Sequence, residues 1–385
     1  MAAREDRAGR NITHLEDHRA FVPEPLPPAP PIDYDDEMLT RLSEADQALG
    51  RLDGSTDALP NPDLFVFMYV RREAALSSQI EGTQASLVDL LEFEAQAAEP
   101  ERPLDVEEIA NYVAAMNYGL QRLDALPVSL RLVREIHECL LSDVRGSERT
   151  PGEFRRSQNW IGPPGCSLNE AIYVPPSVEQ MNSALREWEA FIHNQQPMPA
   201  LIKIGLAHAQ FETIHPFLDG NGRVGRLLIT LLLVENRILT RPLLYLSHFF
   251  KQHRQRYYDM LQAIRDEGEW EAWLRFFLRG VAEVAHEATV TARQIVGMRE
   301  AHRALITSDL GRGAGKALVL LEQLYFRPIV NVNSVMQATD LSFARANHLV
   351  ARLEDLGLLR ETSGRTRNRV FSYEPYMTLF REGSA

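Results

Sequence analysis

The sequence HPFLDGNGRVGR, His215 to Arg226, contains a histidine, a carboxylate, three glycines and two arginines. Glycines let the backbone curl so that successive N–H groups can point at phosphate oxygens. A largely apolar segment, Leu227 to Val234, follows directly. If that segment is helical, the phosphates lie at its N-terminus, where unpaired N–H groups and the helix dipole favour anions. The stretch therefore predicts a loop that binds a nucleoside triphosphate.

The charged side chains of this stretch fit the same ligand. Asp219 offers a hard oxygen ligand suited to Mg2+ that is shared with phosphates. Arg223 and Arg226 are one helical turn apart and can neutralise further phosphate charge. His215 titrates near neutrality and can take a proton from an attacking hydroxyl. A glycine-rich turn with a solvated histidine is the plainer alternative, although turns rarely need HPF, Asp and two Arg together.

The stretch resembles the signature of the Fic family, HPFx[D/E]GNGRxxR, at every specified position. Most Fic proteins are protein adenylyltransferases, which move AMP from ATP onto a hydroxyl side chain of a target protein. The resemblance implies that ATP and Mg2+ are used, that His215 is the catalytic base and that Asp219 holds the metal. The residues it assigns to nucleotide binding are Gly220, Asn221, Gly222, Arg223, Val224, Gly225 and Arg226.

A second motif lies upstream, in RREAALSSQIEGTQAS, residues 71–86. Its Ala, Leu, Glu and Arg favour a helix, which Gly82 interrupts, and Ser77 and Glu81 would share one face of that helix. On its own such a pair is usually a solvated helix surface. SSQIEG, however, resembles the [S/T]xxxE[G/N] inhibitory motif of autoinhibited Fic proteins. The resemblance implies that Glu81 pairs with Arg226, repels the γ-phosphate and leaves ATP misaligned for attack.

Apolar residues recur at spacings of three and four along most of the chain, which predicts a mainly α-helical fold. For 227–234, periodicity also allows a buried strand, and the resemblance to Fic favours a helix. Ser86 and Asp89 predict the cap of one further helix. The expected helices cover residues 63–81, 87–97, 107–120, 130–140, 178–194, 200–214, 224–236, 243–265 and 270–281.

The least helical stretch is Gly152 to Pro176, in which two short apolar segments flank GPPG. It predicts a β-hairpin with a long tip. The resemblance implies a flap that lies over the active site and aligns an extended target segment by strand addition; a purely structural hairpin is the alternative. Tyr258 lies where similar proteins often place a tyrosine near the nucleotide, whereas a core pair with Tyr257 is equally consistent. We interpret His137 and His208 as packing histidines.

The sequence suggests four regions. Residues 1–60 are expected to form an extended, proline-rich arm, and residues 61–127 contain helices with the inhibitory motif. Residues 128–285 resemble the Fic catalytic core, and residues 300–385 resemble a winged-helix domain. Helices are expected at 316–326, 332–339 and 343–356, followed by two strands around a turn at residues 363–364.

Three arginines near that turn, Arg365, Arg367 and Arg369, would share one face of a strand and could touch phosphates. Basic residues only slightly outnumber acidic ones in this tail, and winged helices also bind proteins. The whole chain has 385 residues and a net charge of −12, which argues against a general nucleic-acid binder. DNA is therefore the less favoured partner at this stage.

Composition places the chain among ordinary globular proteins, with 45% hydrophobic and 24% charged residues. Its two cysteines, Cys139 and Cys166, make no disulfide framework, so a cytoplasmic location is expected. We expect no membrane association, because no apolar leader is evident and the longest apolar segment is too short to span a bilayer. The resemblance to Fic proteins also implies a homodimer.

The sequence thus predicts an autoinhibited adenylyltransferase that moves AMP from ATP to a Ser, Thr or Tyr hydroxyl of a target protein, or of itself, and releases pyrophosphate. Two alternatives stay open. The same residues could remove AMP from a modified target, with Glu81 orienting a water. Alternatively, the protein could be a transcription regulator that works through its winged helix.

Overall fold

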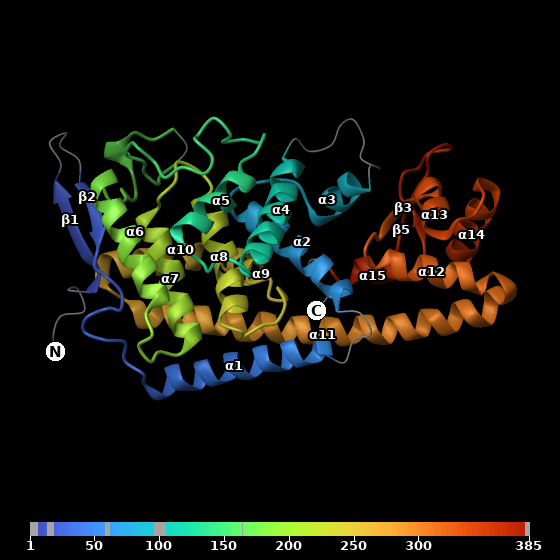
Figure 1. The fold of residues 1–385 in the computed structure, drawn as a ribbon, viewed down its shortest axis with the longest axis horizontal. Coiled ribbons are helices and arrows are strands. Elements are labelled where there is room, and N and C mark those ends of the chain that lie inside the picture. Colours follow the sequence, from blue (N-terminus) through green and yellow to red (C-terminus); the bar gives the residue numbers. More distant parts are fainter. Residues whose placement is uncertain (1–6, 14–18, 58–61, 96–104, 164, 382–385) are drawn as a thin grey trace.

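The computed structural model describes residues 7–13, 19–57, 62–95, 105–163 and 165–381. Over these ranges the chain is mainly helical, and its two small antiparallel sheets lie at opposite ends of an elongated molecule (Figure 1). The predicted fold class is confirmed. Among the described residues, no helix is both long enough and apolar enough to cross a membrane.

The core is a helical bundle around α8, whose residues Asn221 to Leu233 are all buried. An element surrounded by neighbours must be apolar on nearly every side, so its sequence lacks a polar face. The helix expected for this segment is confirmed. Its partners in the bundle are α2 (Asp63–Ile80), α4 (Val106–Arg122), α5 (Leu130–Leu140) and α7 (Ala200–Ile214), and α6 (Val178–His193) packs on α7; α8 itself spans Asn221–Glu235.

The N-terminal arm is more structured than predicted. β1 (Gly9–Thr13) pairs antiparallel with β2 (Arg19–Pro23), and α1 (Asp36–Asp57) packs along α11 (Trp270–Leu310) (Figure 1). The expectation of an extended arm to residue 60 is wrong for these elements. The buried residues of α1 include Met38, Ala45, Leu49 and Leu52. Their spacing is helical, but two thinly spread leucines and an alanine make a weak apolar stripe beside the conspicuous prolines.

Two other expected boundaries also differ. The single helix expected over 243–265 is two helices, α9 (Ser247–Gln252) and α10 (Arg254–Glu267), because the backbone of His253 leaves the helical region at φ −112° and ψ 35°. The predicted gap between the core and the C-terminal domain, residues 285–300, lies inside α11. One continuous helix therefore runs from the core into the C-terminal part of the molecule. By contrast, α3 (Leu87–Glu94) begins with the predicted capping box of Ser86 and Asp89.

The predicted hairpin over 152–176 is reduced to one β-bridge, Ile161 to Tyr173, with a short 3-10 helix, η2 (Leu168–Glu170), at the tip. Prolines at 163, 175 and 176 lack the N–H donors that a longer ladder needs. Side chains replace those bonds: Gln158 donates to the carbonyl of Pro175 at 2.9 Å. We call residues 152–176 the flap segment; its role in target binding stays a prediction.

The C-terminal unit, residues 311–381, has a three-stranded sheet of order β3-β5-β4 beside the helix pair α13 and α14. The winged-helix designation stays a prediction. Arg365, Arg367 and Arg369 do not share a strand, because residues 362–369 form a loop in which Glu361 accepts hydrogen bonds from the N–H groups of residues 363 and 364. The elements are η3 (Gly311–Gly313), α12 (Ala314–Leu324), β3 (Ile329–Asn331), α13 (Val332–Thr339), α14 (Phe343–Asp355), β4 (Arg360–Glu361), β5 (Val370–Ser372) and α15 (Glu374–Thr378).

Candidate active site

His215 stands at the end of α7, where its backbone adopts the left-handed conformation with φ 49° and ψ 61°. Such a conformation is costly for a residue with a β-carbon and persists only where the surroundings impose it. Here Arg155 and Asn159 donate to the His215 carbonyl at 3.1 and 3.2 Å. The flap segment thereby fixes the backbone of the predicted catalytic histidine.

The His215 ring is set up to accept a proton. Its Nδ1 lies 3.3 Å from the carbonyl of Glu212, so Nδ1–H donates and Nε2 keeps its lone pair. Burial, together with the positive charges of Arg265 and Arg155, lowers the pKa of His215 to about 4. The imidazole is therefore neutral at pH 7, which is the form a general base needs.

Two hydrogen bonds of the Asn221 side chain hold the turn after His215. The Asn221 side chain accepts from the Phe217 N–H and donates to the Phe217 carbonyl, both at 2.8 Å. The amide oxygen and one of the two side-chain N–H donors thus hold the turn. The predicted role of Asn221 in positioning phosphates stays a prediction.

His137 supports the same turn from α5. Its ring stacks on Phe217 at 3.7 Å, its Nε2–H donates to the Asp219 carbonyl at 3.1 Å, and its Nδ1 accepts from the Gly152 N–H at 2.9 Å. Burial lowers the pKa of His137 to about 4, so the ring stays neutral and both bonds hold at pH 7. The predicted packing role is correct, although no pattern in the sequence indicates its hydrogen-bond partners.

Residues 219–226, which we call the phosphate loop, present donors toward an anion. Gly220 has φ 78° and caps α8 without any side-chain capping bond, so the first N–H groups of the helix stay available. Arg223 is only 1% exposed, yet its Nε and Nη1 lack hydrogen-bond partners among the described residues. Its nearest carboxylate oxygens, on Asp219 and Glu108, are 3.4 and 3.5 Å away. Buried donors left unpaired cost free energy, and phosphate oxygens would satisfy them.

Asp219 fits the predicted metal role only in a shared site. Its Oδ1 accepts from the Gly220 N–H at 2.6 Å, and its side chain is 31% exposed. Within the described part of the chain, no cluster of three or more His, Cys, Asp or Glu side chains could hold a metal. Mg2+ commonly binds one or two carboxylates and the phosphates of its substrate, so one aspartate at a phosphate site is a fitting donor.

Arg226 is occupied by α2, as the inhibitory motif predicts. Its Nε donates to Ser77 Oγ at 2.8 Å, and its Nη2 donates to the Ser77 carbonyl at 3.0 Å and to Glu81 Oε1 at 2.7 Å. Burial would raise the pKa of Glu81, but the charge of Arg226 holds it below its ordinary value. Glu81 is therefore ionised at pH 7 and neutralises the guanidinium.

The phosphate loop is shaped to admit that carboxylate. A β-carbon on Gly222 would lie 2.2 Å from Glu81 Oε1, so only glycine allows this approach. The helix that carries Glu81 is also fixed from behind. Glu73, two turns earlier on α2, accepts from the Ser247 N–H at 3.0 Å and from the Tyr112 hydroxyl at 3.3 Å. Glu81 itself is the C-cap residue of α2, with a side chain 33% exposed.

Two tyrosines next to the site have different surroundings. Tyr257 is buried and bonds His208 Nε2 at 2.9 Å, while His208 Nδ1–H donates to the Gly225 carbonyl at 3.0 Å. Tyr258 is 38% exposed, and its pKa is raised by burial and by the charge of Glu81, which places it near the inhibitory carboxylate. Tyr257 is thus a core residue, and Tyr258 remains available as the predicted nucleotide contact.

Several residues at the site escaped the sequence analysis. Glu212 is 6% exposed, its Oε1 has no hydrogen-bond partner among the described residues, and a β-carbon on Gly225 would lie 2.3 Å from it. Burial raises the pKa of Glu212 to about 7. Its position three residues before His215 was the available signal. Arg155 and Arg265 offered none, since only the folded chain brings them to the histidine. Val224 is fully buried, so its side chain packs the core and only its backbone can face a nucleotide.

Comparison with known proteins agrees with this geometry. Residues 39–121 match the model of the Fic/DOC family N-terminal region, and residues 127–233 match that of the Fic/DOC family. A protein named protein adenylyltransferase Fic from Aedes aegypti is 28% identical over 277 residues, 68% of this chain and 51% of that one. The protein of the same name from Culex quinquefasciatus is 30% identical over 183 residues, 44% of this chain and 33% of that one. The chain thus spans about half or less of these relatives.

A solved structure shares the fold. The crystal structure of a Fic family protein from Desulfovibrio desulfuricans aligns with a TM-score of 0.59 at 18% identity, over 89% of this chain and 97% of that one. The matched models include α2 with Glu81 and the bundle up to α8. The chain therefore belongs to the Fic/DOC family.

Proposed function

We propose that this protein is an adenylyltransferase that moves AMP from ATP to a hydroxyl group of a protein and is held inactive by Glu81. The observation that carries the proposal is the juxtaposition of a neutral, backbone-pinned His215 with a phosphate loop whose buried Arg223 has unpaired donors. The names of the relatives, protein adenylyltransferase Fic, support the same reaction.

In the proposed reaction, His215 Nε2 accepts the proton of a target Ser, Thr or Tyr hydroxyl while the hydroxyl oxygen attacks the α-phosphorus of ATP. The bond from the α-phosphorus to the bridging oxygen breaks, and pyrophosphate leaves with that oxygen. Arg223 and the first N–H groups of α8 stabilise the phosphate charge, and Asp219 would share Mg2+ with the phosphates. Bound Mg2+ would neutralise charge on the leaving pyrophosphate. Positioning and charge stabilisation supply most of the acceleration in such transfers.

Inhibition follows from the occupancy of Arg226. The Glu81 carboxylate pairs with the Arg226 guanidinium at 2.7 Å and would repel a phosphate that approached the same guanidinium. Bound ATP would then have to place its outer phosphates elsewhere, which turns the α-phosphate away from the line of attack. Because α2 is fixed by Glu73 and Ser77, we propose that release involves the Glu81 side chain and the last turn of α2 rather than the whole helix.

The test compares the purified protein with its Glu81→Gly variant. Each is incubated with Mg2+ and ATP labelled on the α-phosphate, with and without cell lysate as a source of targets. Label should enter protein strongly only in the variant, and ATP labelled on the γ-phosphate should label nothing. Gly cannot reach Arg226, so the guanidinium becomes free to bind phosphate.

The control is His215→Ala in the Glu81→Gly background, which should stay unlabelled. If the Glu81→Gly protein is also unlabelled with every target source, AMP transfer is contradicted. If the parent protein instead removes AMP from a pre-labelled target and loses this ability without Glu81, the hydrolase alternative replaces the proposal.

A further inference from the structure

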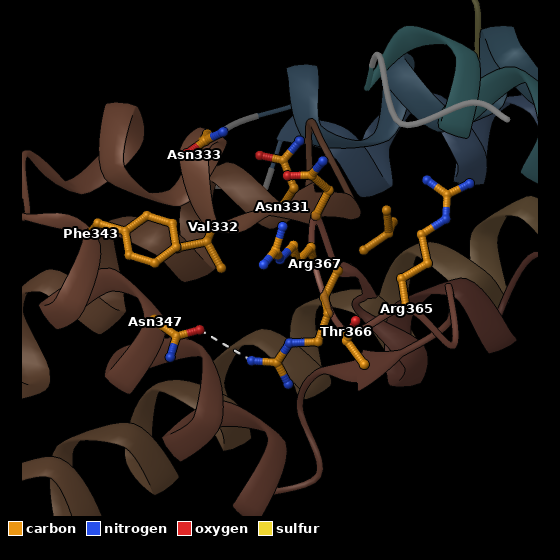
Figure 2. Close-up of a pocket in the computed structure, with 11 residues that line it drawn as sticks. Asn331, Val332, Asn333, Phe343, Asn347, Arg365, Thr366 and Arg367 are labelled. Carbon is orange, nitrogen blue, oxygen red and sulfur yellow. Dashed lines mark hydrogen bonds between the residues drawn. The ribbon is translucent and has the colours of Figure 1, made fainter.

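A cleft of about 900 Å3 lies in the C-terminal unit, far along the molecule from the phosphate loop (Figures 1 and 2). The starts of α13 and α14 line one side, and residues 362–369, which we call the arginine loop, line the other. The lining includes Arg365, Arg367 and Arg369 and four asparagines. Among the described residues that line it, none is acidic. A cleft with this composition suits an anion with many hydrogen-bond acceptors.

The helix side of the cleft presents side chains to solvent. Phe343, the first residue of α14, is 58% exposed, and Arg345 and His348 on the same helix are exposed too. The Phe343 ring is therefore accessible to a ligand in the cleft. Only residues 340–342 separate α13 from α14, which is the short connection of a helix-turn-helix pair. The second helix of such a pair uses its N-terminal residues to contact bases.

The loop side is tied to that helix. Arg369 donates to Asn347 Oδ1 of α14 at 3.1 Å and lies over the Phe371 ring at 5.0 Å, so the loop keeps its place beside the helix. Arg365 and Arg367 are exposed, and Figure 2 shows them across the cleft from Val332 and Phe343. One extended ligand could therefore contact the helix and the arginine loop together.

The net charge of the C-terminal unit differs in sign from that of the rest of the chain. Residues 311–381 contain ten Lys and Arg against six Asp and Glu, a net charge of +4. The whole chain carries −12, so the remainder carries −16. A polyanion would be repelled by the rest of the surface and attracted to this unit. The net negative charge of the whole chain disfavours nucleic acid, but it does not describe this positively charged unit.

We propose that the C-terminal unit binds duplex DNA, with the N-terminal half of α14 in the major groove and the arginine loop against neighbouring phosphates. The major groove of B-DNA, about 12 Å wide, admits a helix, whereas that of an RNA duplex is too deep and narrow. Phe343 provides an apolar contact for a thymine methyl group, and Asn347 provides an amide beside it. Arg365 and Arg367 pair with phosphate oxygens. This binding does not depend on AMP transfer.

The test measures fluorescence anisotropy of a labelled random-sequence duplex of about 30 base pairs with the full chain at about 50 mM salt. The cleft variant is Arg365→Ala with Arg367→Ala. The matched control is Lys316→Ala with Arg327→Ala, which removes the same charge from exposed positions of the same unit outside the cleft. We expect the cleft variant to bind at least about tenfold more weakly, with a salt slope lower by about 2. The control should change binding less than about threefold, because it removes only the long-range attraction of two positive charges to the DNA and leaves the contacts in the cleft intact.

Three results would overturn the proposal. The parent protein could fail to bind the duplex at low salt, both double variants could weaken binding equally, or single-stranded DNA or duplex RNA could bind more tightly than duplex DNA. All four substituted side chains are exposed, so both variants should keep the melting temperature of the parent. Phe343→Ala gives a second, uncharged check: it should weaken duplex binding while the salt slope stays the same.

Discussion

The phosphate loop and the arginine loop both present arginines to phosphate, but in opposite surroundings. Arg223 and Arg226 are 1% and 2% exposed, and α2 already supplies a carboxylate to one of them. Arg365 and Arg367 face an open cleft. The first pair lies at the centre of the bundle beside His215, and the second lies on a surface loop in the C-terminal unit.

Burial explains why Arg226 needs a carboxylate counter-ion within the fold. A buried guanidinium interacts strongly with an anion, but it is costly to leave unpaired when the ligand is absent. Glu81 is the counter-ion of Arg226, and under the proposed function it would compete with the phosphate that replaces it. An exposed arginine keeps its water and needs no such partner. Its attraction is weaker and is screened by salt.

The strongest contrast between the loops should appear in the proposed chemistry of the buried one. In the Glu81→Gly background, His215→Ala should lower the rate of AMP transfer by about a hundredfold to ten thousandfold, because no neutral base remains beside the attacking hydroxyl. Incorporation of α-labelled AMP measures it. The control is His193→Ala, which removes an exposed histidine at the end of α6 and should leave the rate unchanged. A His215→Ala protein that keeps a tenth of the rate would refute the role of this base.

The second prediction is that ligand binding at the two loops differs in its dependence on salt. Between about 50 and 200 mM salt, duplex binding at the arginine loop should weaken by about ten- to a hundredfold if two to four phosphates are contacted. ATP binding by the Glu81→Gly protein should weaken less than about threefold, since buried charges are poorly screened. Titrations with labelled duplex and labelled ATP over the same salt series provide the comparison. Equal slopes would show that burial does not distinguish the loops.

The sequence predicted the helix, turn and helix around residues 215–226 well because the signals are local. His215, Asp219 and the two arginines lie within one turn and the start of one helix, so spacing alone brings them together. Helix α7 ends and helix α13 begins where predicted, and the signals are again local: a proline follows His215, and Asn331 caps the N-terminus of α13.

Part of what the sequence could not predict depends on distant parts of the chain. Arg155 of the flap segment donates to the His215 carbonyl, the charge of Arg265 on α10 acts on the His215 ring, and no spacing in the sequence indicates either interaction. Two other differences are local. The Asn221 amide is used by Phe217, four residues away, and the loop after β4 is shaped by hydrogen bonds that Glu361 accepts from the next residues, where a strand was expected. At these two places a side chain bonded to nearby backbone overrides the simple pattern.

A third experiment separates the charge of Glu81 from its shape. Glu81→Gln keeps an oxygen that can accept from Arg226 but removes the negative charge that repels phosphate. A hydrogen bond to a charged group contributes about 1.5–3 kcal/mol, so Gln should still restrain Arg226 and give roughly tenfold less AMP transfer than Gly. Both should exceed the parent. If Gln and Gly are equally active, the charge alone inhibits; if Gln is as inactive as Glu, occupancy of the arginine is sufficient and charge adds nothing.

The last prediction concerns the free energy of unfolding and tests the cost of burying Glu212. Its raised pKa of about 7 means that the folded protein binds this proton more tightly than the unfolded chain does, whose glutamate titrates near 4.5. The contribution to stability is therefore present below about 4.5 and is lost as pH rises through about 7. Glu212→Gln cannot lose this proton. Between pH 5 and 8 the unfolding free energy of the parent should therefore fall relative to that of the variant, by on the order of 1 kcal/mol.

Chemical denaturation at each pH measures this difference. Glu148→Gln, which changes a side chain 70% exposed, should follow the parent at every pH because its carboxylate keeps its water in the folded state. A Glu212→Gln difference that does not vary with pH would mean that Glu212 is ionised in the folded protein, paired with Arg226 or Arg265. Burial would then cost the phosphate loop nothing at this position, and the contrast with the exposed arginine loop would rest on Arg223 and Arg226 alone.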